Sequence, residues 1–309
     1  MIAALYVLVG LFLLLFSGEL LVKGAVSTAG HFRLSPFAIA ATIVSFGTSA
    51  PELVVSVTAS LGNHSGIALG NVVGSNIANI LLALGLVFLL NPNQLLKSQK
   101  YDTIIMITFT LIFIFCVTLF DSINRLLGLL FILGLLIYII WVLKLGESDT
   151  KNHETKEHIK YSKYKSLFFL FFGILGVLLG AKFLVMGSVD LASIMGVSET
   201  VIGLSVVALG TSLPEAVISS IAVLRNASKV AVGAVVGSNI FNLFGIVGFS
   251  ALFRPLDTLQ TISFTDILLL FISTLFISFF ILKGIKKTKP IGFLMLICYM
   301  LYVSFLYAY

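Results

Sequence analysis

Long apolar runs, separated by short polar segments, recur along the whole chain. A helix needs about 20 apolar residues to cross a bilayer, and ten runs reach or approach that length. They lie at 2–22, 36–61, 67–90, 103–120, 126–144, 166–188, 200–224, 229–253, 267–283 and 291–309. The pattern therefore predicts an all-α membrane protein with ten transmembrane helices and no room for a separate soluble domain.

Composition supports this class and changes how the net charge is interpreted. Hydrophobic residues make up 59% of the chain and charged residues only 10%, against about 25% charged in soluble domains. The net charge of +6 therefore indicates no nucleic-acid partner. Sixteen of the 19 lysines and arginines follow odd-numbered runs. The positive-inside rule then predicts a plasma-membrane protein with both termini outside and the lysine-rich segment 146–165 in the cytoplasm.

Two smaller features fit a protein that is retained in the membrane. The N-terminal run has no basic region before it, so we interpret it as a permanent helix rather than a cleaved signal peptide. Cys116 and Cys298 both fall within apolar runs. Buried thiols, rather than a disulfide framework, are the expected state of these two residues.

The chain contains one long internal repeat. A shift of 163 residues superposes 47–79 on 210–242 with 20 identities in 33 positions and no gap. Each half, 1–145 and 166–309, then holds five expected helices, with 146–165 as the connecting loop. Because five is odd, the second half must enter the membrane with the opposite polarity. Inverted repeats are typical of secondary transporters, whose sites lie at the midplane between the repeats.

The repeated motifs begin with GTSAPE and GTSLPE, which carry a proline and a glutamate inside apolar runs. Pro51 has no amide hydrogen, and Gly47 loosens the same turn, so we expect discontinuous helices at a central ion site. Polar or carbonyl-bearing positions then share neighbouring rows of each helix. In the first half these are Ser45, Thr48, Ser49, Glu52 and Ser56, and in the second Ala208, Thr211, Ser212, Glu215 and Ser219.

Two intramembrane carboxylates at equivalent positions indicate a cation site. A charge at the bilayer centre costs about 2.5–3.5 kcal/mol on insertion scales, which disfavours a purely structural role for Glu52 and Glu215. The alternative is a neutral, hydrogen-bonded contact between helices. Carboxylate, hydroxyl and carbonyl oxygens are the ligands of hard cations, and neither motif has a histidine or cysteine nearby that would favour zinc or copper.

The second part of each motif, GNVVGSNIAN and GAVVGSNIFN, adds further polar positions. Asn71, Ser75 and Asn79 share a helix face, as do Ala234, Ser238 and Asn242 in the second half. Buried amides need partners, so Asn79 and Asn242 are expected either to contact the cation or to bond between helices. A separate stripe that includes Gly70 and Gly74 predicts close approach of another helix.

These motifs resemble the two alpha repeats of the cation/Ca²⁺ exchanger superfamily, and most closely its prokaryotic sodium/calcium exchanger branch. The resemblance covers essentially the whole chain. It implies antiport of Na⁺ against Ca²⁺ by alternating access, with both ions as substrates, no permanently bound cofactor, the lipid bilayer as surroundings and a functional monomer. It also implies that the first and sixth helices slide across the core.

The resemblance further implies a role for each site residue. Glu52 and Glu215 would bridge the Ca²⁺ and Na⁺ positions. Flanking Na⁺ positions would be formed on one side by Thr48, Ser49 and Ser75, and on the other by Thr211, Ser212 and Ser238. Carbonyl groups of Ser45, Thr48, Ala208 and Thr211 would complete the shells.

One position departs from the family pattern. Asn242 stands where sodium/calcium members usually carry aspartate, so the cluster holds two formal negative charges instead of three. Exchange coupled to H⁺ or Li⁺ therefore remains an alternative to Na⁺ coupling. A cation channel is the alternative from another class. An intramembrane enzyme is disfavoured, because the core motifs contain no aspartate pair, Ser–His set or HExxH sequence.

Overall fold

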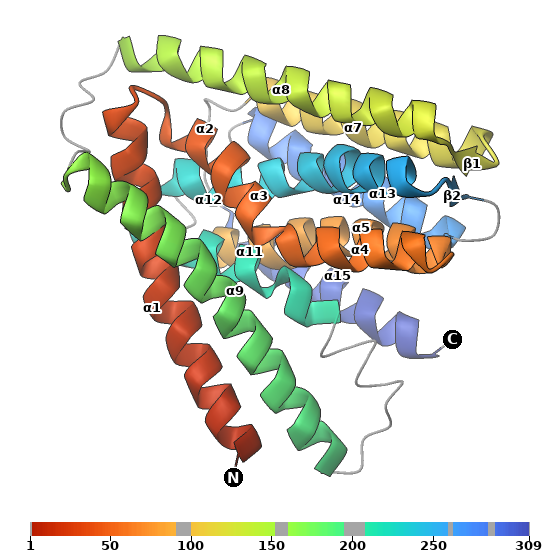
Figure 1. The fold of residues 1–309 in the computed structure, drawn as a ribbon, viewed down its shortest axis with the longest axis horizontal. Helices are drawn as coiled ribbons and strands as arrows, with labels where there is room; N and C mark the ends of the chain where they lie inside the picture. The colour runs from red at the N-terminus through yellow and green to blue at the C-terminus, as the bar shows by residue number, and fades with distance from the viewer. Residues whose placement is uncertain are drawn as a thin grey trace.

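The computed structural model describes residues 2–90, 100–151, 160–194, 208–258, 262–283 and 288–308. Figure 1 shows a bundle of long helices, with α1 and α9 forming a separate pair at lower left and α7 and α8 running along the top. This helical, strongly apolar architecture confirms the predicted membrane class.

The helices follow the predicted apolar runs closely. The first half contains α1 (Ile2–His31), α2 (Pro36–Ile39), η1 (Ala40–Val44), α3 (Ser45–Thr48), α4 (Ala50–Leu61), α5 (Ser65–Ala78), η2 (Asn79–Leu84), α6 (Gly85–Leu90), α7 (Lys100–Leu119) and α8 (Arg125–Lys151). The second contains α9 (Lys163–Ile194), α11 (Ala208–Leu224), α12 (Ser228–Ile240), η5 (Phe241–Ile246), α13 (Val247–Phe253), α14 (Phe264–Lys283) and α15 (Lys289–Ala308). The elements η1, η2 and η5 are wider, π-helical turns.

The described residues contain seven helices that are long and apolar enough to cross a membrane. The bent pair Pro36–Thr48 and Ala50–Leu61 makes an eighth if it is taken as one span, and Gly210–Leu224 and Lys289–Phe305 are shorter apolar helices. The first part of the expected seventh span, 200–207, lies outside the described residues. Within the expected loop 146–165, α8 continues to Lys151 and α9 begins at Lys163.

Two short strands join the ends of helices from different halves. The strands β1 (Ser122–Ile123) and β2 (Leu256–Asp257) pair antiparallel, with Ser122 opposite Asp257. The amide of Asp257 also donates to the hydroxyl of Ser65 at 3.0 Å. The turn between α7 and α8 is thereby fastened to the segment after α13 and to the start of α5.

Helices α1 and α9 pack against each other through reciprocal glycine contacts. A Cβ added at Gly10 would lie 2.5 Å from the amide nitrogen of Leu184, and one at Gly173 would lie 2.6 Å from the Cα of Leu21. The shift of 163 residues converts one contact into the other. A second reciprocal set joins Gly24 to Leu170 and Gly187 to Val7. Rising numbers on α1 meet falling numbers on α9, so these equivalent helices are antiparallel.

The helix that carries the first motif is bent where the sequence predicts a break. Ser49 (φ −85°, ψ 11°) separates α3 from α4, and the two parts of the span differ in direction by 49°. Pro51 lies in the first turn of α4, where its missing amide hydrogen leaves no intrahelical bond unmade.

The corresponding expectation for the second half is wrong over the part that the structure describes. Helix α11 runs without interruption from Ala208 to Leu224, with Pro214 inside it. A proline removes only one backbone hydrogen bond from a helix. Because α11 packs against α1, α9 and α12, these neighbours hold the remaining turns in helical geometry.

The predicted glycine stripe differs between the halves. A Cβ at Gly237 on α12 would clash with the backbone of Ala41, whose Cα would lie 2.5 Å away. At Gly70 and Gly74, the equivalent stripe on α5, no described atom would lie within 4 Å of such a Cβ. The counterpart of Ala41 in the second half is Leu204, which lies outside the described residues. The close contact is therefore found at α12 and not, among the described residues, at α5.

The helices that carry the repeated motifs form the interior of the bundle. The most apolar stretch of Ser228–Phe253 is 100% buried and that of Ser65–Leu90 is 78% buried, against 28% for Lys163–Leu191. Polar residues on α12 and α5 are thus enclosed by protein, whereas α9 exposes most of its side chains. This arrangement separates the polar centre from the surrounding lipid.

Candidate cation site

The carboxylate of Glu215 joins residues from both halves of the chain. Its Oε1 accepts a hydrogen bond from the hydroxyl of Ser49, at the break before α4, at 2.9 Å. The hydroxyl of Ser238 on α12 donates to the same oxygen at 3.3 Å. All three residues are buried. Three residues that the sequence assigned to one site are therefore brought together here.

Glu52 is the equivalent carboxylate on α4, and its side chain is only 1% exposed. Glu52 follows closely after Ser49, the residue whose hydroxyl bonds to Glu215, so the two carboxylates lie in the same part of the interior. One oxygen of each, Oε2, is buried without a hydrogen-bond partner among the described residues. Unpaired buried carboxylate oxygens are costly, so the arrangement favours a positively charged ligand between these groups.

Two asparagine amides extend the set of unpaired oxygens. Asn79 and Asn242 are buried, and within the described residues neither side-chain atom of either amide has a hydrogen-bond partner. Asn79 begins η2, and Asn242 is the second residue of η5, so both lie in π-helical turns. Such turns are rare and occur frequently at functional sites. The predicted alternative, bonding between helices, is not made by these amides in the described structure.

The other predicted positions differ from one another in burial and in hydrogen bonding. Ser75 and Ser212 are buried, and the hydroxyl of Ser212 has no partner among the described residues. Thr211 is partly buried and takes part in a further interaction. Ala208 is the first residue of α11. Its predicted contribution is a backbone carbonyl.

Backbone oxygens near the break are already used within the first half. The carbonyl of Ser45 accepts from the hydroxyl of Thr48 at 3.2 Å and from the amide of Ser49 at 3.0 Å. The hydroxyl of Ser45 donates to the carbonyl of Thr42 at 3.2 Å. These bonds stabilise the short α3 segment and orient the turn that presents Ser49 to Glu215.

Ser56 fastens two helices together instead of joining the carboxylates. Its hydroxyl donates to the carbonyl of Ala68 at 3.2 Å, and the equivalent Ser219 donates to Ala231, also at 3.2 Å. Contacts related by the 163-residue shift therefore recur in the interior as well as between α1 and α9. They set the spacing of α4 on α5 and of α11 on α12.

Asparagines that the sequence reasoning did not assign also occupy the centre. Asn71 donates to the carbonyl of Glu52 at 3.1 Å and to the hydroxyl of Ser56 at 2.9 Å. Asn76 and Asn239, which both follow the serine of the GSNI motif, are buried, and each has an Oδ1 without a partner among the described residues. The presence of asparagine at both equivalent positions, 76 and 239, is the sequence feature that could have identified this pair.

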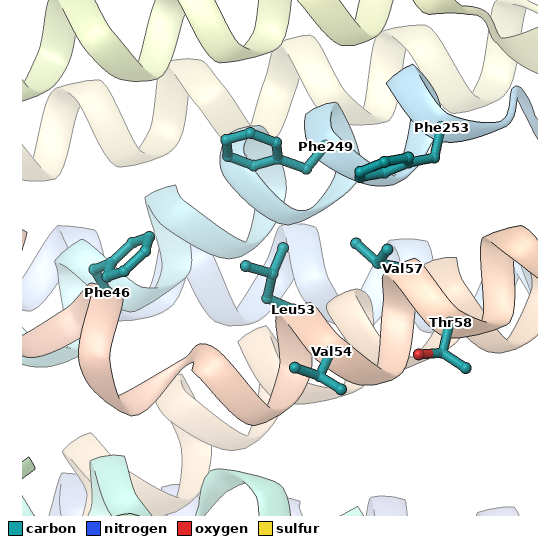
Figure 2. Close-up of a pocket in the computed structure, with 7 residues that line it drawn as sticks. All are labelled: Phe46, Leu53, Val54, Val57, Thr58, Phe249 and Phe253. Carbon is teal, nitrogen blue, oxygen red and sulfur yellow. The ribbon is translucent and has the colours of Figure 1, made fainter. Parts of the chain in front are cut away.

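A cavity of about 360 Å³ between α4 and α13 does not fit the same ligand class. Figure 2 shows the rings of Phe46, Phe249 and Phe253 and the side chain of Leu53 around it, with Thr58 as the lone oxygen-bearing side chain among those drawn. Several of these side chains are exposed on the apolar surface. Because hard cations require several oxygen ligands, this cavity is not a cation site.

The buried cluster around Glu52 and Glu215 has the donor chemistry of a hard-cation site. Two carboxylates supply negative charge, while serine hydroxyls and asparagine amides supply neutral oxygens. Ca²⁺ takes 6–8 oxygen ligands, and the polar groups bonded to Glu215 come from both halves of the chain. Donors of this kind are suited to Na⁺ or Ca²⁺.

Comparison with known proteins gives the same assignment. The family model described as sodium/calcium exchanger protein matches residues 2–144 and 165–308. The sodium/calcium exchanger MaX1 of Methanosarcina acetivorans is 32% identical over 320 residues, covering 87% of this chain and 91% of its own. The inner membrane protein YrbG of Escherichia coli is 30% identical over 263 residues, covering 82% and 81% respectively.

A solved structure extends the agreement to the fold. The sodium-calcium exchanger NCX_Mj superposes with a TM-score of 0.86 at 32% identity, and the match covers 98% of each chain. Family model, relatives and structure all span both halves of the chain, including both repeated motifs. This protein therefore belongs to the sodium/calcium exchanger family.

Proposed function

We propose that the protein exchanges Na⁺ for Ca²⁺ across the plasma membrane by alternating access. The family consists of secondary transporters rather than enzymes. The observation that carries the proposal is the buried pair Glu52 and Glu215, whose Oε2 atoms lack a partner in the described structure. The hydrogen bond from Ser49 to Glu215, at 2.9 Å, connects Glu215 to the break before α4, the helix of the other repeat that carries Glu52.

The proposed architecture is ten transmembrane helices in two inverted repeats. The seven long helices, the bent pair and the two shorter apolar helices match the ten expected spans. The antiparallel contact of α1 with α9, made by equivalent residues on both sides, supports the inversion. The distribution of basic residues supports external termini and a cytoplasmic central loop. A monomer contains both halves of the proposed site.

Within the site, the two glutamates would hold Ca²⁺ or share Na⁺ ions. One flanking Na⁺ position would use Thr48, Ser49 and Ser75. The other would use Thr211, Ser212 and Ser238. The carbonyl-bearing positions Ser45 and Ala208 and the amides of Asn79 and Asn242 would complete the set. The unpaired state of both amides in the described structure supports their inclusion.

Charge balance explains why occupancy by the two ions would be mutually exclusive. Two ionised glutamates neutralise one Ca²⁺, so a Ca²⁺ together with several Na⁺ ions would leave excess positive charge in a low-dielectric interior. Asn242 keeps the cluster at two formal charges. Because the missing third charge changes the number of coupling cations that the site neutralises, exchange coupled to H⁺ or Li⁺ is the second candidate.

The test is uptake of radiolabelled Ca²⁺ by proteoliposomes loaded with Na⁺ and diluted into Na⁺-free medium. We expect uptake that disappears when Na⁺ is equal on both sides. Glu52→Gln and Glu215→Gln should each abolish it, whereas Asp121→Asn, at an exposed turn, should retain it. Uptake that persists without any counter-ion gradient would indicate a channel. Uptake driven only by a Li⁺ gradient or a pH gradient would show that Li⁺ or H⁺, rather than Na⁺, is the coupling ion.

A further inference from the structure

A second cavity, of about 600 Å³, lies where α1 meets the turn between α11 and α12. Four basic side chains contribute to its wall: Lys23 of α1, Lys160 just before α9, and Arg225 and Lys229 at the α11–α12 turn. None of the residues assigned to the cation site lines it. Its chemistry is therefore separate from cation binding.

The charges around this cavity are only partly balanced. Glu19 pairs with Lys23 at 2.7 Å and with Arg225 at 2.6 Å. In the described part of the chain, neither Lys160 nor Lys229 forms an ion pair. Four cationic side chains thus line the cavity and one carboxylate pairs with two of them, so the excess positive charge favours an anionic ligand.

The start of α12 adds to this positive potential. Ala227, Ser228 and Lys229 line the cavity, and α12 begins at Ser228. The side chain of Ala227, at the N-cap position, makes no capping hydrogen bond. The N-terminus of a helix carries a partial positive charge and directs amide groups toward anions. A phosphate group is an anion with the oxygens that such a site binds.

The position and the apolar part of the wall favour a lipid over a free anion. Val22, Val26 and Pro36 line the cavity beside the basic groups. On α1 the exposed large apolar side chains end at Phe16, and Lys23 follows about 10 Å further along the helix. The cavity is therefore close to the edge of the lipid-facing surface, where headgroups lie.

We propose that this cavity binds the phosphate headgroup of an anionic phospholipid. The phosphate would contact Lys160, Lys229 and the start of α12, while its glycerol backbone would contact the apolar wall. Basic pockets between membrane helices recognise anionic headgroups in this way. The bound lipid would connect α1 to the α11–α12 turn, and it would compete with Glu19 for Arg225.

The proposal is tested by measuring lipid binding to purified protein in detergent by native mass spectrometry. Phosphatidylglycerol and phosphatidylcholine with identical acyl chains are the probes. The wild type should prefer phosphatidylglycerol. Lys160→Gln combined with Lys229→Gln should weaken that binding about 30-fold, and Lys100→Gln combined with Lys289→Gln, at exposed positions outside the cavity, should not. Glu19→Gln should strengthen it, because two cations lose their paired carboxylate.

Several results would overturn the proposal. They are equal affinity for the two lipids, equal losses in the two double variants, or no gain in Glu19→Gln. Complete displacement of phosphatidylglycerol by millimolar inorganic phosphate would assign the cavity to a free anion instead of a lipid. If the double variant does not fold, Lys160→Gln alone serves, since Lys160 is exposed and outside any helix. It should weaken binding about fivefold, and an unchanged affinity would refute the assignment.

Discussion

The hydrogen bond between Ser49 and Glu215 offers a direct test of whether the two repeats form one ion site. Replacing Ser49 with alanine removes the donor that lies 2.9 Å from Oε1 of Glu215. Both residues are at most 1% exposed, so bulk solvent does not reach the bond in this conformation. A buried hydrogen bond to a charged group contributes about 1.5–3 kcal/mol, which corresponds to roughly a 10- to 150-fold change in an equilibrium constant.

The chain offers a matched control on α4, the helix that begins directly after Ser49. Ser60 is also buried and donates from its hydroxyl to the carbonyl of Ser250 at 2.9 Å, outside the carboxylate cluster. Ser49→Ala and Ser60→Ala each remove a 2.9 Å bond between the same two halves, and Ser60→Ala also removes a longer one, 3.2 Å, to the carbonyl of Arg254. The two variants should differ in ion affinity, because only Ser49 contacts a glutamate.

The assay is the initial rate of Ca²⁺ uptake into proteoliposomes as a function of the internal Na⁺ concentration. We expect the half-saturating Na⁺ concentration to rise at least about tenfold in Ser49→Ala and to stay unchanged in Ser60→Ala. The thermal unfolding temperature of each variant reports the purely structural contribution. Equal Na⁺ dependence in the two variants would refute the reasoning, because the bond to Glu215 would then only hold helices together.

Two further predictions concern packing and charge. Gly237→Ala should destabilise the fold by about 1–3 kcal/mol, because the added Cβ would meet the backbone of Ala41. Gly70→Ala, at an exposed helical position, should leave the unfolding temperature unchanged or raise it. A lower unfolding temperature for Gly70→Ala than for Gly237→Ala would contradict the packing assigned to α12. Asn242→Asp adds a third carboxylate to the cluster, so it should change the ion preference or the number of Na⁺ ions exchanged per Ca²⁺. The reversal potential of exchange reports this change. An unchanged reversal potential would remove Asn242 from the site.

Much of the architecture could be predicted from apolar runs and from the repeat. The span predicted at 36–61 coincides with Pro36–Leu61, because Pro36 and the turn at Gly62 bound a mostly apolar segment. The break at Ser49 followed from Gly47 and the missing amide hydrogen of Pro51. The same local argument failed at Pro214, since the packing around α11 outweighs one lost hydrogen bond.

The parts of the candidate site that escaped prediction depend on contacts between distant segments. Helical spacing places Ser49 on a row of its own helix, but it does not reveal that the hydroxyl bonds to Glu215, 166 positions away. The π-helical turns at Asn79 and Asn242 likewise have no simple sequence pattern. Asn71 was predicted to share the face of Ser75, and only the packed structure reveals that its amide bonds to the backbone of α4.

The reciprocal contacts between α1 and α9 make this interface self-complementary. The close contact of Gly10 with Leu184 is repeated by Gly173 with Leu21. An isologous dimer, in which both partners use the same patch, has the same arrangement. Replacing Gly10 with a larger residue therefore distorts only one of the two related contacts. The same replacement at Gly173 would distort the other contact equally and restore the symmetry. When the halves are produced as separate polypeptides, we therefore expect each half to present its equivalent glycines to a second copy of itself.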